Sequence, residues 1–134
     1  MRIFGIAAAV IALGWALAAP ASADPSVVGS YDVVNSPEVW TVTSCGADCV
    51  DVASNTGPNR HLHLNDGRWL STPYVGSVHC PVDNSEATAE MVTTVDANFT
   101  GYTDKMLKVI GTCRDGYSFI GQTIDVSGEL IKRP

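Results

Sequence analysis

Short runs of alternating bulky and polar residues recur about every eight to twelve positions along most of this chain. Alternation with a period of two is the pattern of a half-buried β-strand, and Gly, Pro, Asn and Asp between the runs supply turns. These short strands predict an all-β fold, either a small antiparallel sandwich or a meander barrel. The predicted strands are Val27–Val34, Val39–Ser44, Cys49–Ala53, Arg60–Leu64, Arg68–Thr72, Val75–Cys80, Thr88–Val95, Lys105–Cys113 and Tyr117–Val126.

One segment leaves a choice between strand and helix. Asn84 or Ser85 could cap a short helix that begins at Glu86 and ends at Val92. We favour a strand, because the chain shows no convincing amphipathic pattern with the 3.6-residue period of a helix.

The Asp66-Gly67 pair predicts the register of one hairpin. Asp-Gly favours a type I′ turn, because both central residues of that turn need positive φ. A two-residue turn at this place sets Leu64 opposite Trp69 and His63 opposite Leu70. The Leu64 and Trp69 side is the natural core side, which leaves His63 pointing outward or lining a pocket.

The first 23 residues have the pattern of a secretory signal peptide. Arg2 precedes a long apolar stretch, and Ala21-Ser22-Ala23 supplies the small residues that signal peptidase accepts, so we expect cleavage before Asp24. The alternative is an N-terminal membrane anchor, since the apolar stretch is nearly long enough to span a bilayer. No second apolar run follows, so we expect no transmembrane anchor after cleavage and a protein that is secreted or in the cell envelope.

Residues 24–134 are enough for one domain and too few for two. The whole chain has 8 basic and 14 acidic residues. Arg2 is the one basic residue of the leader, so the remaining chain carries 7 basic residues and a net charge of −7. So acidic a surface repels the phosphate backbone, and we expect no nucleic-acid partner.

The four cysteines indicate two disulfides, because their number is even and the chain is expected to be exported. Four cysteines allow three pairings. The local pattern favours Cys45–Cys49, because Gly46-Ala47-Asp48 resembles a three-residue hairpin loop that would set these two cysteines directly opposite each other. Cys80 is then left to pair with Cys113.

A redox centre and a metal site are the alternatives for the first cysteine pair. A thioredoxin-type motif needs two intervening residues at a helix N-terminus, whereas three residues intervene here, in a hairpin, with Asp48 beside the second thiol. A zinc site built with the histidines is compatible with the residue count but not with an oxidising compartment. We therefore predict structural disulfides, with no metal and no cofactor.

The order of the tryptophans, glycines and cysteines resembles that of small exported proteins of mycobacteria and related actinobacteria. The residues that carry this resemblance are Tyr31, the run Trp40-Thr41-Val42-Thr43-Ser44-Cys45-Gly46-x-x-Cys49, Gly67-Arg68-Trp69, Cys80 and Cys113. The resemblance covers most of residues 24–134 and implies export and a β-rich fold. It lends no catalytic residue, since its landmarks are structural.

Two tryptophans and two histidines are the candidate ligand-binding residues. Trp40 and Trp69 are expected either to anchor the core or to form the floor of an apolar pocket. His61 and His63 lie on the same side of a predicted strand and could share a metal ion or act in acid–base chemistry, although solvent-exposed strand histidines are the favoured interpretation.

No motif brings together a nucleophile, a base and an orienting group, so we assign no catalytic residue. The sequence favours a non-catalytic binding or envelope-associated domain whose partner is a small molecule, an envelope component or a protein. One alternative is a small secreted hydrolase or metal-binding protein that uses His61 and His63. Another is a secreted protease inhibitor with Cys80-Pro81-Val82-Asp83 as its reactive segment.

Overall fold

The computed structural model describes residues 26–114, 116–119 and 124–134, and over these ranges the protein is all β, as predicted. The predicted signal peptide and its cleavage site lie outside the described residues, and no helix in the described ranges could span a membrane. The strands are β1 Gly29–Val33, β2 Val39–Gly46, β3 Cys49–Ser54, β4 Arg60–Asn65, β5 Arg68–Ser71, β6 Tyr74–His79, β7 Glu86–Asp96, β8 Gly101–Val109 and β9 Asp125–Lys132.

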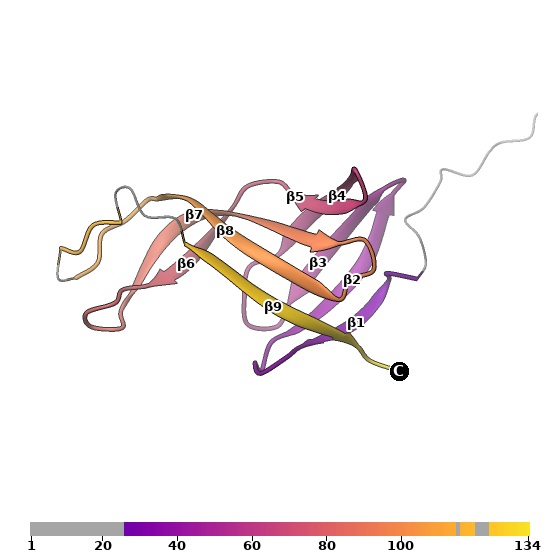
Figure 1. Cartoon of the computed structure of the whole chain (residues 1–134), viewed down its shortest axis with the longest axis horizontal. Helices are drawn as coiled ribbons and strands as arrows, with labels where there is room; N and C mark the ends of the chain where they lie inside the picture. The colour runs from indigo at the N-terminus through magenta and orange to yellow at the C-terminus, as the bar shows by residue number, and fades with distance from the viewer. Residues whose placement is uncertain (1–25, 115, 120–123) are drawn as a thin grey trace, which may run out of the picture.

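Eight of these strands form a closed antiparallel barrel. β1 to β5 follow one another as a meander, β7 pairs with β5, β8 with β7 and β9 with β8, and β9 closes the ring against β1. β6 lies outside the ring, along the first half of β7 (Figure 1). The sequence was compatible with both a sandwich and a barrel, and the pairings β1–β9 and β5–β7 show that the sheet forms a barrel.

The strand β7 belongs to two parts of the molecule. Its first residues pair with β6, from Glu86 opposite His79 to Met91 opposite Tyr74, and its last three pair with β5. Every second side chain of β7 is buried, which confirms the strand and excludes the short helix in this segment. We call residues 74–91, 106–114 and 116–119 the extension, which projects from the barrel on the left of Figure 1.

Two separate apolar cores result from this arrangement. The barrel core contains Val27, Tyr31, Val33, Trp40, Val42, Val50, Val52, Leu62, Trp69, Val95, Phe99 and Leu130. The extension core contains Val78, Cys80, Ala87, Ala89, Met91, Met106, Cys113 and Phe119. The first is rich in aromatic and branched side chains, and the second in small and sulfur-containing ones.

Aromatic rings fill the middle of the barrel. The ring centroids of Tyr31 and Phe99 lie 5.4 Å apart, those of Trp69 and Phe99 5.9 Å, and those of Trp40 and Tyr102 4.8 Å. All three separations are in the range of favourable aromatic pairs. Side chains therefore fill the interior of this barrel, as is common in small barrels.

Both predicted disulfides are present, Cys45–Cys49 and Cys80–Cys113. The predicted three-residue loop is wrong. The turn has two residues, Gly46 lies opposite Cys49, and Cys45 is the extra residue of a β-bulge that follows Ser44. The bulge shifts the register by one residue but leaves the two Cα atoms 5.1 Å apart, within disulfide reach.

The first seven predicted strands agree with the structure to within two residues at each end. The last two predictions agree less well: β8 runs from Gly101 to Val109 where Lys105–Cys113 was predicted, and β9 runs from Asp125 to Lys132 where Tyr117–Val126 was predicted. Residues 120–123 of that last prediction lie outside the described residues. The sequence pattern did not indicate β9, because it contains Gly128 and glycine usually weakens a strand. Tyr102 lies opposite Gly128 and its ring occupies the space where a Cβ would stand, so this pair supports β9.

The Asp66-Gly67 hairpin has the predicted register, with Leu64 opposite Trp69 and His63 opposite Leu70. Both turn residues have positive φ, 50° and 75°, as the type I′ turn requires. Trp69 lies in the core as expected, whereas Leu64 lies near the tip of the hairpin and is exposed.

Candidate functional site

Two polar clusters lie on opposite sides of the barrel wall at the start of β4. Arg60 points inward and His61 outward, because successive side chains of a strand face opposite sides of the sheet. We call Glu38, Arg60, Tyr74, Thr93 and Asp104 the Arg60 cluster. We call Cys45, Cys49, Asp51, His61 and His63 the His61 cluster.

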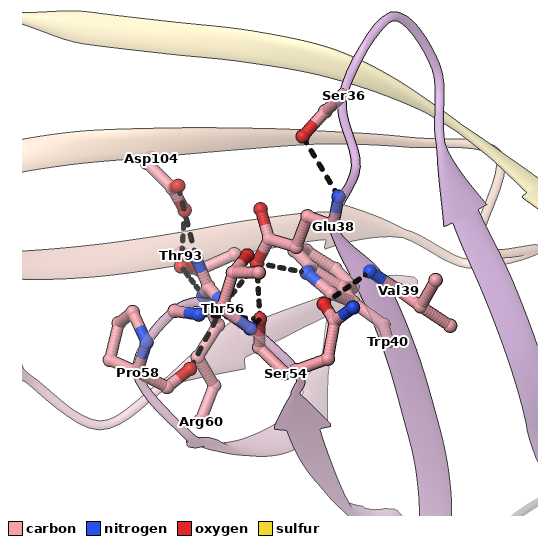
Figure 2. A network of polar contacts seen from close by, with 12 residues as sticks. Ser36, Glu38, Val39, Trp40, Ser54, Thr56, Pro58, Arg60, Thr93 and Asp104 are labelled. Atoms are coloured by element: carbon pink, nitrogen blue, oxygen red, sulfur yellow. Dashed lines mark hydrogen bonds and ion pairs between the residues drawn. The ribbon is translucent and has the colours of Figure 1, made fainter.

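The guanidinium of Arg60 is buried and uses all three nitrogens. Nε donates to Thr93 Oγ1 at 2.9 Å and to Tyr74 Oη at 3.3 Å. Nη1 donates to the carbonyl of Pro58 at 3.2 Å, and Nη2 to Asp104 Oδ2 at 3.2 Å. Thr93 also donates to Asp104 Oδ1 at 2.5 Å, so Arg60, Thr93 and Asp104 form one connected network (Figure 2).

Glu38, the residue that precedes β2, extends the same network. Its Oε1 accepts from the indole nitrogen of Trp40 at 2.8 Å and from Ser54 Oγ at 2.7 Å, and lies 3.7 Å from Arg60 Nη1. The Trp40 and Tyr74 rings lie 4.7 and 5.1 Å from the guanidinium carbon, within the range of cation–π attraction.

The surroundings keep Arg60 charged and Tyr74 neutral. Burial by itself would lower the pKa of Arg60, but Asp104, Tyr74 and Glu38 raise that pKa above its ordinary value. The pKa of Tyr74 is raised, mainly by burial and also by Asp104, although Arg60 opposes the shift. The cluster therefore joins a cation to carboxylates through neutral hydroxyls.

The Arg60 cluster separates the two apolar cores. On β7, Thr93 lies between Met91 of the extension core and Val95 of the barrel core. Asp104 occupies the equivalent place on β8, between Tyr102 and Met106. In the described part of the chain, every buried side-chain nitrogen and oxygen has a hydrogen-bond partner. The buried polar atoms of the cluster are therefore satisfied within the protein, and the cluster acts as a structural joint between the two cores.

Sequence reasoning missed this cluster. Arg60 forms hydrogen bonds with Tyr74, 14 positions away in the sequence, and with Asp104, 44 positions away. No local motif connects residues so far apart. The only available signal was a charged residue at the start of an otherwise apolar-alternating strand.

The His61 cluster lies on the outer face of β2, β3 and β4. His61 Nδ1 lies 2.5 Å from Asp51 Oδ1, and the two residues are cross-strand partners. The imidazole also covers the disulfide, since Nδ1 lies 3.8 Å from Cys45 Sγ and Nε2 3.7 Å from Cys49 Sγ. The His63 ring packs edge-on against His61 at a centroid distance of 4.7 Å.

Solvent reaches this outer cluster. The side chains of His61 and Asp51 are 43% and 54% exposed. Both candidate histidines therefore lie on the outside of the barrel, where the hairpin register placed His63, and the structure adds two neighbours that the sequence did not reveal, Asp51 and the disulfide.

One group of side chains in the described residues has ligand atoms close enough for a metal ion. These are the sulfurs of Cys45 and Cys49 and a ring nitrogen of His61, all within 4.8 Å of one another. The two sulfurs are bonded to each other, however, and a cysteine binds zinc only as a thiolate. His63 is not a member of this group.

A groove of about 450 Å³ runs along the outer face beside the His61 cluster. Its walls come from β2, β3, the residue before β4 and the first residues of β4, and from Thr72 and the first residue of β6. They consist of Thr41, Thr43, Asp51, Val52, Ala53, Asn59, Arg60, His61, Thr72 and Tyr74. Hydroxyl, amide, carboxylate and imidazole groups thus converge on one concave surface.

Trp40 and Trp69 lie in the closed barrel core, with 0% and 2% of their surface exposed. Both tryptophans are therefore core anchors and do not form the floor of a pocket.

The segment Cys80–Asp83 lies in a tight turn between β6 and β7, closed by hydrogen bonds from Cys80 N to Ser85 O and from Asn84 N to Cys80 O. A protease cleft accommodates an extended segment, so this turn gives the inhibitor hypothesis no support.

Comparison with known proteins adds no function to this geometry. No family model matches the chain, and neither a curated protein nor a solved structure matches it. The function must therefore be inferred from the clusters and the groove themselves.

Proposed function

We propose that this protein is an exported, non-catalytic binding domain whose outer groove takes a hydroxyl-rich ligand, such as a glycan of the cell envelope. The observation that carries the proposal is the groove itself. Thr41, Thr43 and Thr72 bring hydroxyl groups to it, Asn59 an amide and Asp51 a carboxylate. These groups donate and accept hydrogen bonds, as a polyhydroxylated ligand requires.

The filled barrel core supports a ligand on the outside. Trp40 and Trp69, which were expected either to anchor the core or to form the floor of an apolar pocket, pack against other rings. The signal-peptide pattern of residues 1–23 and the two disulfides support export.

The proposal can be tested by titrating the purified, oxidised protein with defined oligosaccharides of arabinose, galactose and N-acetylglucosamine while recording amide NMR spectra. We expect one class of sugar to shift the amide signals of Thr41, Thr43, Asn59 and Thr72. The double substitution Thr41→Val and Thr43→Val should weaken that binding about tenfold, because two hydroxyl hydrogen bonds are lost.

Thr88→Val is the matched control, because Thr88 is exposed on β7 of the extension, away from the groove. Its affinity should equal that of the unaltered protein. Binding that perturbs amides elsewhere, or no binding of any of these sugars at millimolar concentration, would contradict the proposal.

A further inference from the structure

The two disulfides of this protein have different surroundings. Cys80 and Cys113 are 1% and 3% exposed and lie inside the extension core. Cys45 is exposed in its bulge, and Cys49 lies beneath the imidazole of His61. A thiolate from solvent can therefore reach Cys45 directly but must unfold part of the extension to reach the second disulfide.

His61 is in contact with both sulfurs of the exposed disulfide and is itself held by a carboxylate. With Nδ1–H donated to Asp51 Oδ1, the remaining nitrogen, Nε2, faces Cys49 Sγ at 3.7 Å. Protonated Nε2 can give a proton to a departing Cys49 thiolate, and neutral Nε2 can take one from a Cys49 thiol. When protonated, an imidazole beside a sulfur also stabilises the thiolate electrostatically, as a helix N-terminus does in thioredoxin-type motifs.

We propose that Cys45–Cys49 is a redox-active disulfide that exchanges with dithiols of other exported proteins, and that His61 is its proton donor and acceptor. This activity does not rest on ligand binding in the groove. It revises the expectation, drawn from the sequence, that this cysteine pair is only structural.

The exchange balances without a further reactant. A thiolate of the partner dithiol attacks Cys45 Sγ, the Cys45–Cys49 bond breaks, and Cys49 leaves with the electron pair and takes a proton from His61. The second partner thiol loses its proton and attacks the partner sulfur in the mixed disulfide, so that Cys45 leaves and is protonated. The partner dithiol is oxidised to a disulfide, and the protein disulfide is reduced to two thiols. The reverse sequence oxidises the protein.

The test is the rate at which dithiothreitol reduces each disulfide of the folded protein. Thiols are trapped with an alkylating reagent at successive times and assigned by mass spectrometry of peptides. We expect Cys45–Cys49 to react about 100-fold faster than Cys80–Cys113. His61→Gln should slow the reduction of Cys45–Cys49 about tenfold or more.

His63→Gln is the matched control, since His63 is on the same strand and face and contacts the His61 ring, yet lies outside the group formed by the two sulfurs and His61. Its rate should stay within about twofold of that of the unaltered protein. Imidazole added to His61→Ala should restore part of the lost rate, which no purely structural role predicts. Equal rates for His61→Gln and His63→Gln would overturn the proposal.

Asp51 acts through His61 as a positioning residue. Asp51→Ala should slow the exchange, and Asp51→Asn, which keeps an oxygen that can accept from Nδ1–H, should recover most of the rate. Equal rates for the two variants would contradict this role. If the reduced protein takes up about one equivalent of Zn²⁺ and then resists reoxidation by a disulfide, the cluster is a metal site and the exchange proposal fails.

Discussion

The barrel and the extension are stabilised by different means. Each strand of the barrel has a neighbour on both sides, and its core is built around four aromatic side chains, Tyr31, Trp40, Trp69 and Phe99. The extension leaves β6 as an edge strand, and its core consists largely of alanine, methionine and cysteine side chains. Closure and aromatic burial hold the first region, whereas the second depends on a covalent link.

The positions of the two disulfides agree with this contrast. Cys80–Cys113 lies within the extension core and links residues 33 positions apart. Cys45–Cys49 lies on the outside of the barrel and links residues only 4 positions apart. Cys80–Cys113 therefore stabilises the region where the sheet does not close on itself, whereas Cys45–Cys49 is accessible to reagents in solvent.

The largest effect is expected from removal of Cys80–Cys113 by two alanine substitutions, which should lower the free energy of unfolding by about 4 kcal/mol, because the linked loop contains about 34 residues. Amide exchange should accelerate in β6 and in residues 86–91 while the barrel strands stay protected. The same substitutions at Cys45 and Cys49 serve as the control and should cost about 2 kcal/mol. If the barrel and the extension were equally protected from amide exchange in the variant without Cys80–Cys113, the two regions would not be stabilised by different means.

The next largest effect is expected from Arg60→Met, which removes the cation that joins the two regions. Asp104 and Glu38 would be left half-buried without their counter-charge, and we expect the free energy of unfolding to fall by about 3 kcal/mol. Urea denaturation measures the loss. Arg60→Met combined with Asp104→Asn should recover part of it, because one uncompensated charge is removed. A double variant less stable than the single variant would mean that the cluster does not act as a charge-balanced joint.

The smallest effect is expected from Tyr74→Phe. The lost hydroxyl interacts with Arg60, Thr93 and Asp104, but these three also bond to one another, so the cost should be about 1 kcal/mol at neutral pH.

The same variant should also alter the response to alkali. Because the folded pKa of Tyr74 is raised, its contribution to stability is present below the unfolded pKa of about 10 and is lost as pH rises through the folded value. Urea denaturation from pH 8 to 11 should therefore show a smaller alkaline loss for Tyr74→Phe than for the unaltered protein. The loss does not vanish, since burial also raises the pKa values of Tyr31 and Tyr102. An unchanged alkaline loss would show that Tyr74 titrates as freely in the folded chain as in the unfolded one.

Predictions from the sequence succeeded where the cause was local. The Asp66-Gly67 turn specified its own register, and the disulfide pairing followed from a hairpin between Cys45 and Cys49, although the predicted length of its loop was wrong. Predictions failed where a contact with a residue far away in the sequence determined the local structure. Gly128 stays in a strand because Tyr102 covers it, and the bulge at Cys45 appears only in the pairing of two whole strands.

The candidate sites divide in the same way. That His63 faces outward could be read from a period of two, because it depends on the backbone of one hairpin. That His61 faces both Asp51 and a disulfide depends on the pairing of β2, β3 and β4, which the sequence did not specify.

By itself, the sequence determined the fold class, most strand positions and the disulfide pairing of this protein, because strand periodicity, turn chemistry and short loops act over a few residues. Only the tertiary structure decided that the sheet closes through β1 and β9, that Arg60 joins two cores, and that an imidazole covers one disulfide. Each of these depends on contacts between segments far apart in the chain, whose energies become favourable only once the whole barrel has formed.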